Sequence, residues 1–160
     1  MATIYLSLGT NVGDRAANLC RATGTMAPEI VVEKLSPVYE TEPMYVTAQP
    51  KFLNMACKAT TALSPLEVLR KAKAIEKEME PAPHVHNEPR VIDIDILFYG
   101  DATIATPELT IPHPRIAERA FVLVPLADVA PELVHPSLGA TILELKNRLG
   151  DTSNGVRPIE

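Results

Sequence analysis

The sequence predicts an α+β fold of the ferredoxin-like class, with a mainly antiparallel sheet, packed helices on one side of it and additions at the C-terminus. Between residues 3 and 98, hydrophobic patterns with the strand period and with the helix period follow one another in the order strand, helix, strand, strand, helix, strand. That order is the split βαβ arrangement. The chain has 160 residues, so residues 1–160 are expected to form a single domain.

The first strand is expected at residues 3–8, and the loop Gly9–Asp14 ends it. Asp14 has the side chain of an N-cap, and the helix that follows is predicted to reach about Met26. A turn-and-cap role for this loop is favoured over phosphate binding, because no Gly-Lys-Ser/Thr follows the glycines.

The middle of the pattern holds two strands, at residues 30–39 and 52–62, separated by a long loop over residues 41–50. Pro37 cannot donate a hydrogen bond to a neighbouring strand, so it predicts an edge position or a bulge in the first of the two. A loop of this length in a compact domain often carries function.

The second helix is expected at residues 65–79, because Ser64 and Glu67 have the spacing of a capping box and Pro65 occupies the first helical position. The fourth strand follows at residues 89–98. The elements expected beyond it are short: extended pieces near 103–104 and 109–111, a helical turn at 111–115, an apolar run at 121–125, a helix or turn at 126–133, a helix at 141–149 and a frayed tail at 151–160.

Composition argues against several classes of protein. The formal net charge of −5 argues against general nucleic-acid binding, which normally leaves a basic face. No apolar run approaches the ~18 residues of a membrane-spanning helix, and no basic segment precedes the first strand. Neither a membrane protein nor a signal peptide is therefore expected, and the cytoplasm is the expected compartment. Cys20 and Cys57 are expected to be buried free thiols.

The fourth strand carries the main candidates for chemistry, Asp93 and Asp95. Alternation places them on one face together with Val91 and Leu97, while the isoleucines between them face the other side. A half-buried charge on a β-branched strand must be paired or must bind a metal. Their Cα atoms would lie about 6.6 Å apart, close enough for both carboxylates to reach one divalent cation or a pair of cations. Oxygen ligands favour Mg²⁺.

Three basic side chains are candidates for bringing positive charge to the same place. Arg90, at the start of the strand, has a guanidinium that suits paired phosphate oxygens, and the alternative is an ion pair with Asp93. Arg119 and His113 flank the next loop. Each has a structural alternative, a helix C-terminal charge for Arg119 and a hydrogen-bonded turn residue for His113.

Phe52 and Phe121 are two of only three phenylalanines in a chain without tryptophan. They are candidates for stacking on a flat heterocycle, with burial in the core as the alternative. Asn54 shares a face with Phe52 and offers a donor and an acceptor to the edge of such a ring. With a metal pair and a phosphate-binding arginine, these residues predict phosphoryl or pyrophosphoryl transfer from a nucleotide to a heterocyclic alcohol.

Along almost its whole length the chain resembles the 6-hydroxymethyl-7,8-dihydropterin pyrophosphokinases of folate biosynthesis. The motifs that carry the resemblance are Leu8-Gly9-Thr10-Asn11-Val12-Gly13-Asp14-Arg15, Ser36-Pro37-Val38-Tyr39-Glu40-Thr41, Phe52-Leu53-Asn54, Ile75-Glu76, Pro89-Arg90-Val91-Ile92-Asp93-Ile94-Asp95-Ile96-Leu97, Ile111-Pro112-His113-Pro114-Arg115 and Glu118-Arg119-Ala120-Phe121-Val122-Leu123. The most specific feature is Pro-Arg-x-x-Asp-x-Asp followed by Pro-His and Arg-x-Phe. A lone Asp-x-Asp would not identify a family.

The resemblance implies ATP as the donor, 6-hydroxymethyl-7,8-dihydropterin as the acceptor, AMP as a product and two Mg²⁺ ions. It also implies roles for individual residues. Those implied for catalysis are Arg90, Asp93 and Asp95, and the two aspartates would hold the metal. Those implied for the pterin are Thr41, Met44, Phe52, Asn54 and Phe121. Those implied for the nucleotide and its phosphates are Glu76, Arg90, His113 and Arg119.

One region departs from the family pattern. The family's loop before Pro-Arg carries a Gly-Arg-x-Arg segment, whereas residues 80–88 contain no arginine, glycine or tryptophan. Glu108 stands where the family has another arginine. His84 and His86 either replace part of that charge or belong to a solvated loop, and lid closure without the arginines would follow a different mechanism.

Two functions of other classes stay open on the sequence. One is a non-catalytic module that binds the pterin. The other is a metal-dependent phosphodiesterase, which would use paired aspartates but would not need Phe52, Asn54 and Phe121.

Overall fold

The structure, a computed structural model, describes residues 1–42, 49–80, 89–152 and 155–159. In chain order its elements are β1 (Ala2–Thr10), α1 (Arg15–Gly24), β2 (Ile30–Leu35), β3 (Tyr39–Thr41), β4 (Phe52–Thr61), α2 (Pro65–Met79), β5 (Asp93–Tyr99), β6 (Ile104–Ala105), β7 (Thr110–Ile111), a 3₁₀ helix (Ile116–Glu118), α3 (Ala120–Val129), α4 (Ile142–Arg148) and β8 (Val156–Pro158). No helix within these described ranges is long and apolar enough to cross a membrane.

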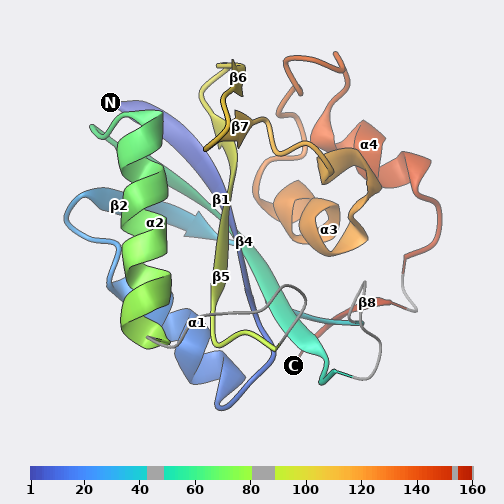
Figure 1. The fold of residues 1–160 in the computed structure, drawn as a ribbon. Helices are drawn as coiled ribbons and strands as arrows, with labels where there is room; N and C mark the ends of the chain where they lie inside the picture. The colour runs from blue at the N-terminus through green and yellow to red at the C-terminus, as the bar shows by residue number, and fades with distance from the viewer. Residues whose placement is uncertain (43–48, 81–88, 153–154, 160) are drawn as a thin grey trace.

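One antiparallel sheet forms the centre of the fold (Figure 1). Its strand order is β5-β1-β4-β3-β8, and β2 also pairs with β4. β1 therefore lies between β4 and β5, the two strands that α2 connects, as in the split βαβ arrangement. β6 and β7 form a separate two-stranded sheet. The predicted α+β fold with a mainly antiparallel sheet is confirmed.

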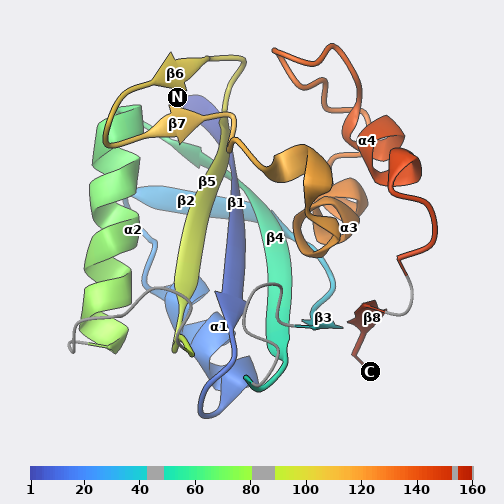
Figure 2. The ribbon, with the colours of Figure 1, turned by 45° about the vertical axis from the view of Figure 1, so that its right-hand side comes forward.

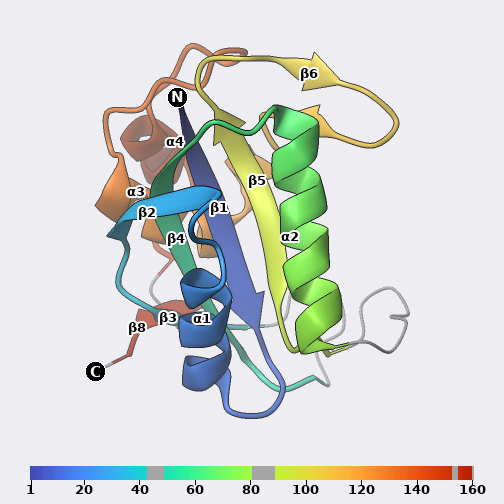
Figure 3. The ribbon, with the colours of Figure 1, turned by 90° about the vertical axis from the view of Figure 1, so that its left-hand side faces the viewer.

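Helices cover both faces of the sheet. α1 and α2 pack on one face, where they share a hydrophobic core with alternate residues of β1, β4 and β5. α3 and α4 pack on the opposite face around residues such as Ala56, Leu97 and Phe98. Figures 2 and 3 show the two layers from different sides. The early helices thus lie on one side, and the C-terminal helices lie on the other.

The predicted signals at the starts of α1 and α2 are confirmed. The Asp14 side chain accepts the Ala17 backbone N–H at 3.1 Å. Ser64 and Glu67 form a reciprocal capping box at the start of α2, with Pro65 as its first residue. These caps satisfy backbone donors that have no partner inside the helix, so the two helices begin where their sequences predict.

The fourth predicted strand is shorter than its alternation suggested, and it contains a bulge. β5 begins at Asp93 rather than at residue 89, and its pairing shifts because Tyr5 opposes Phe98 whereas Leu6 opposes Ile96. Leu97 is therefore an extra residue, which disrupts the alternation. As a result Leu97 and Phe98 both lie in the core with α3.

Two other predicted boundaries were wrong. The strand expected at residues 30–39 is two strands, because β2 ends before Pro37 and β3 begins after it. Both strands pair with β4. The run 121–125 and the segment 126–133 are not separate elements, because α3 continues through Pro125 to Val129. Seven of the ten residues of α3 are buried, Pro125 among them, and this packing outweighs the hydrogen bond that proline cannot donate.

The tail and one thiol also differ from expectation. Val156–Pro158, within the tail expected to fray, pairs with β3 as β8, and Val156 is buried against Tyr39. The partners of this strand are distant in sequence, so the tail's own residues do not reveal the pairing.

Cys57 is a buried free thiol as predicted, whereas Cys20 is exposed on α1.

Candidate active site

Rows of cross-strand neighbours bring the two predicted aspartates close to Asn54. Gly9 of β1 opposes Asp93 of β5 on one side and Asn54 of β4 on the other. In the next row Ser7 opposes Asp95. Directly opposed residues point to the same face of a sheet. The aspartates and Asn54 therefore share one face, and it is the face on which α3 packs.

Gly9 lies at the centre of this row, and the Asn54 side chain occupies the space that a side chain on Gly9 would need. A Cβ atom on Gly9 would lie 2.6 Å from Asn54 Oδ1 and 3.5 Å from Phe52 Cδ1, and the first distance is an overlap. Because glycine has no side chain, Asn54 and Phe52 can lean over β1 toward the aspartates. The sequence predicts Gly9 in the loop after the first strand, whereas it lies inside β1, and the alternation pattern gives no indication of this role. Its place in the first family motif was the only signal.

The residues predicted for the pterin are supported by β3 and β4. Asn54 is 4% exposed, and its Nδ2 atom donates to Thr41 Oγ1 at 2.6 Å. Within the described ranges this is the one hydrogen bond of the Asn54 amide, and its second N–H and its carbonyl oxygen are groups that can bind a ligand. Phe52 is half-buried at the first position of β4. Met44, also predicted for the pterin, lies outside the described residues, as do His84 and His86.

Phe121 approaches the site from α3. It is half-buried and packs against a small cluster that includes Tyr39, and Tyr39 is the cross-strand partner of Asn54. The Tyr39 hydroxyl donates to the Asp128 carboxylate, so β3 is fastened to α3. Burial and then the Asp128 charge raise the pKa of Tyr39 to about 12. These contacts fix the position of Phe121 relative to Asn54.

Asp95 lies where a negative charge is disfavoured. Burial raises the pKa of Asp95 to about 7, the Asp93 carboxylate adds to the rise, and Arg119 opposes it. A divalent cation would lower that pKa, because a nearby opposite charge favours the ionised form. The described residues hold no group of three or more His, Cys, Asp or Glu side chains that would bind a metal by themselves. The carboxylates of Asp93 and Asp95 are oxygen ligands of the kind that a hard divalent cation prefers.

Arg90 lies between the aspartate strand and α2. Its Nη1 atom is 3.7 Å from Asp93 Oδ1, and its Nη2 atom is 3.9 Å from Glu76 Oε1. Both distances are long for charge-assisted hydrogen bonds. The Arg90 Nε atom is buried and has no hydrogen-bond partner among the described residues. The predicted ion pair with Asp93 is thus loose, and the planar donor set of the guanidinium is compatible with a phosphate.

Glu76 of α2 contacts protein groups that shape the site. It is 6% exposed. Its Oε2 atom accepts the Ile94 backbone N–H at 2.8 Å, and its Oε1 atom accepts from Lys73 Nζ at 3.1 Å. Ile94 lies between the two aspartates. Glu76 therefore holds the backbone of the aspartate strand, and it lies next to Arg90.

His113 and Arg119 belong to the segment between β7 and α3. The Nδ1 atom of His113 accepts the Arg115 backbone N–H at 3.4 Å. Burial and then the positive charge of Arg119 lower the pKa of His113, while Asp93 acts in the opposite direction. The Arg119 guanidinium carbon is 5.5 Å from the centre of the Phe121 ring, a cation–π distance. These two predicted residues are therefore close enough to influence the aspartates.

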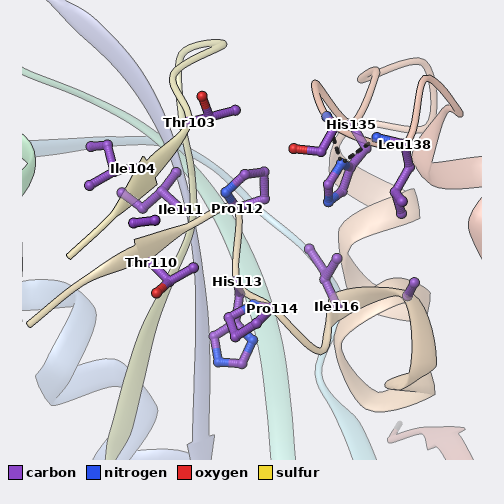
Figure 4. A pocket seen from close by; sticks show the side chains of 13 residues that line it. Thr103, Ile104, Thr110, Ile111, Pro112, His113, Pro114, Ile116, His135 and Leu138 are labelled. Carbon is purple, nitrogen blue, oxygen red and sulfur yellow. Dashed lines mark hydrogen bonds between the residues drawn. The ribbon is translucent and has the colours of Figure 1, made fainter. Parts of the chain in front are cut away.

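A cavity of about 390 Å³ adjoins the site (Figure 4). It lies between the β6–β7 hairpin and the segment that joins α3 to α4. Among the described residues predicted for the site, only His113 lines it. The other labelled walls are Thr103, Ile104, Thr110, Ile111, Pro112, Pro114, Ile116, His135 and Leu138.

Comparisons with known proteins give a consistent family. A sequence profile described as 7,8-dihydro-6-hydroxymethylpterin-pyrophosphokinase (HPPK) matches residues 5–131. The chain is 40% identical over 151 residues to the folic acid synthesis protein FOL1 of Dictyostelium discoideum, which is 94% of this chain and 23% of that protein. It is 41% identical over 146 residues to the 2-amino-4-hydroxy-6-hydroxymethyldihydropteridine pyrophosphokinase of Aquifex aeolicus, which is 91% of each chain.

A solved structure supports the fold. A variant of Plasmodium falciparum HPPK-DHPS with pterin and p-hydroxybenzoate matches with a TM-score of 0.80 at 20% identity, over 99% of this chain and 47% of that one. The chain spans less than a quarter of the Dictyostelium protein and most of the Aquifex one. Because the profile covers most of the sequence, this chain belongs to the 7,8-dihydro-6-hydroxymethylpterin-pyrophosphokinase family.

Proposed function

We propose that this chain transfers the pyrophosphoryl group of ATP to 6-hydroxymethyl-7,8-dihydropterin and releases AMP. We assign the reaction to folate biosynthesis in the cytoplasm and to residues 1–160 as a single domain. The observation that carries the proposal is a pair of neighbouring rows in the sheet: Gly9 opposes Asp93 and Asn54, and Ser7 opposes Asp95. Both carboxylates therefore share one face of the sheet with Asn54 and Phe52. Family membership and the name of the Aquifex relative supply the substrates.

The reaction requires positioning more than covalent chemistry. The hydroxymethyl oxygen of the pterin attacks the β-phosphorus of ATP, and the bond from that phosphorus to the oxygen it shares with the α-phosphorus breaks. AMP leaves with the shared oxygen, and the hydroxyl proton is lost. The protein must hold two substrates in line and offset the charge of the phosphates.

On the pterin side, the Asn54 amide suits the polar edge of the ring because Thr41 fixes its orientation. Phe52 and Phe121 are assigned to the two faces of the ring. Both are half-buried rather than fully enclosed in the core. Met44 is assigned to the same pocket by family resemblance.

On the phosphate side, we assign Arg90, Arg119 and His113 to the nucleotide. Arg119 immediately precedes α3, and its positive charge acts on both Asp95 and His113, so it lies where the phosphates are assigned. Since the pKa of His113 is lowered and its Nδ1 atom accepts a hydrogen bond, the neutral ring carries its proton on Nε2, and this Nε2–H can donate to a phosphate oxygen. Glu76 is assigned to the nucleotide side through its contact with Arg90.

We assign two Mg²⁺ ions to Asp93 and Asp95. Their oxygen ligands and concentrated negative charge suit a hard cation. When bound, the ions supply the charge neutralisation that the phosphates require. Asp95 must be ionised to take part, and its raised pKa means that the metal competes with a proton at this carboxylate.

An assay of AMP release tests the proposal. The chain should form AMP only when ATP, the dihydropterin and Mg²⁺ are all present. Asp95→Ala should lower turnover by about 100-fold or more with an unchanged circular dichroism spectrum. Asp101→Ala, at the exposed turn after β5, is the matched control and should remain active.

Two outcomes would overturn the proposal. Tight binding of the pterin without AMP release would favour a non-catalytic binding module. Hydrolysis of a phosphodiester in the absence of any pterin would favour a metal-dependent phosphodiesterase.

A further inference from the structure

Asn11, which follows β1, is hydrogen-bonded to the main chain of Arg90. Asn11 is 1% exposed. Its backbone N–H donates to the Arg90 carbonyl oxygen at 3.0 Å. Its Oδ1 atom accepts the Arg90 backbone N–H at 2.7 Å. One asparagine thus holds both main-chain polar groups of the residue assigned to the phosphates.

The same side chain also reaches the start of β4. Asn11 Nδ2 donates to Gln49 Oε1 at 3.0 Å and to the Pro50 carbonyl oxygen at 3.1 Å. Phe52, assigned to the pterin, begins the strand just after Pro50. A backbone N–H only donates and a backbone carbonyl only accepts, so Arg90 and Pro50 together fix which way the amide points. Both N–H donors and the acceptor of the Asn11 amide are in use.

We infer that Asn11 is a positioning residue that sets the placement of Arg90 relative to the Phe52 end of β4. The inference rests on the proposed function, which assigns Arg90 to the phosphates and Phe52 to the pterin. Asn11 acts through these two segments and not through a substrate. Its effect should appear mainly in the chemical step, because a misplacement of ~1 Å between reacting groups can cost ~100-fold in rate.

No other side chain of similar size supplies the same contacts. Leucine would remove all of the side-chain hydrogen bonds. Aspartate would keep the acceptor for the Arg90 N–H, but its second oxygen would face the Pro50 carbonyl oxygen and repel it. Asn18 on α1 provides a matched control, because its side chain is also hydrogen-bonded to this loop region: its Nδ2 atom donates to Thr10 Oγ1 at 3.2 Å and to the Val12 carbonyl at 2.9 Å. Neither contact involves Arg90 or Pro50.

The test compares Asn11→Leu, Asn11→Asp and Asn18→Leu in the full chain. Three quantities are measured: kcat for AMP release, the Kd of the dihydropterin alone, and the Kd of a non-hydrolysable ATP analogue with Mg²⁺. Both Asn11 variants should lower kcat by about tenfold or more, while each separate Kd changes by less than about threefold, since each half of the site keeps its own contacts. Asn18→Leu should change all three quantities by less than about threefold.

A kcat for Asn11→Leu close to that of the wild type would overturn the inference. An equal loss in Asn18→Leu, or a loss expressed only in one Kd, would do the same. If Asn11→Leu does not fold, Asn11→Asp decides by the same criteria, and its failure to fold would show a structural role instead. A wild-type chain that releases no AMP overturns the proposed function as well, whereas an active wild type with unaffected Asn11 variants overturns only this inference.

Discussion

Glu76 accepts the Ile94 backbone N–H at 2.8 Å, at the midpoint between the two aspartates of β5. β5 is the last of the described strands at its end of the sheet, so none of them pairs with its outer edge. The carboxylate from α2 satisfies a donor on that edge. The helix thus holds the backbone from which Asp93 and Asp95 project.

Removal of this carboxylate should destabilise the fold and the site together. Glu76→Ala should lower the free energy of unfolding by about 1–3 kcal/mol, because the buried Ile94 N–H loses its acceptor. Glu76→Gln keeps an acceptor and should recover part of the loss. Urea denaturation and AMP release measure the two effects. Glu78→Ala, exposed on the same helix, is the control, and a Glu76→Ala chain as stable as this control would contradict the prediction.

The raised pKa of Asp95 predicts how the stability of the metal-free chain depends on pH. The ordinary value is 3.8 and the folded value is about 7. Between these values the folded state binds a proton that the unfolded state has lost. The contribution of Asp95 to the free energy of unfolding is therefore greatest below the ordinary value and falls as the pH rises to about 7.

Asp95→Asn removes this dependence. The free energy of unfolding of the variant minus that of the wild type should therefore increase by about 1 kcal/mol or more from pH 5 to pH 8. Urea denaturation at the two pH values without metal measures the gain. Asp101→Asn should differ from the wild type by the same amount at both. A constant difference for Asp95→Asn would contradict the assigned pKa.

Gly9 and Gly24 should respond differently to the same substitution. In Gly9→Ala the new Cβ would overlap Asn54 Oδ1, so Asn54 or Phe52 must move and the Kd of the dihydropterin should rise by about tenfold. In Gly24→Ala the new Cβ, at the end of α1, would have no atom of another described segment within 4 Å. That variant should keep its affinity and gain up to about 1 kcal/mol of stability. Calorimetric titration with the pterin would settle the comparison, and equal affinities would refute it.

The two thiols should react at very different rates. Cys20 is exposed, whereas Cys57 is buried and burial raises its pKa to about 12. A disulfide reagent should therefore modify one thiol per native chain and two after unfolding in urea. Cys20→Ser should leave the native chain unreactive. Rapid reaction of that variant would show that β4 opens in the native state.

Some features were accessible from the sequence because they depend on neighbours a few residues apart. Asp14 and Ser64 identified the starts of two helices, and alternation placed Asp93 and Asp95 on one face. Features that depend on packing were not accessible. Pro125 inside α3 and the late strand at Val156 both contradict local expectation, because burial against distant segments outweighs local preference.

By itself the sequence determined the alternation of strands and helices up to residue 98, apart from the division of residues 30–39 into two strands, together with the residue types of the candidate site and the family motifs that contain them. Only the tertiary structure decided that Gly9 separates Asp93 from Asn54, that Glu76 holds Ile94 and that Asn11 joins Arg90 to Pro50. The physical reason is the range of the interactions. Hydrophobic periodicity and helix capping depend on residues a few positions apart in the sequence. Strand register and buried hydrogen bonds instead join residues that are distant in the sequence and that only folding brings together.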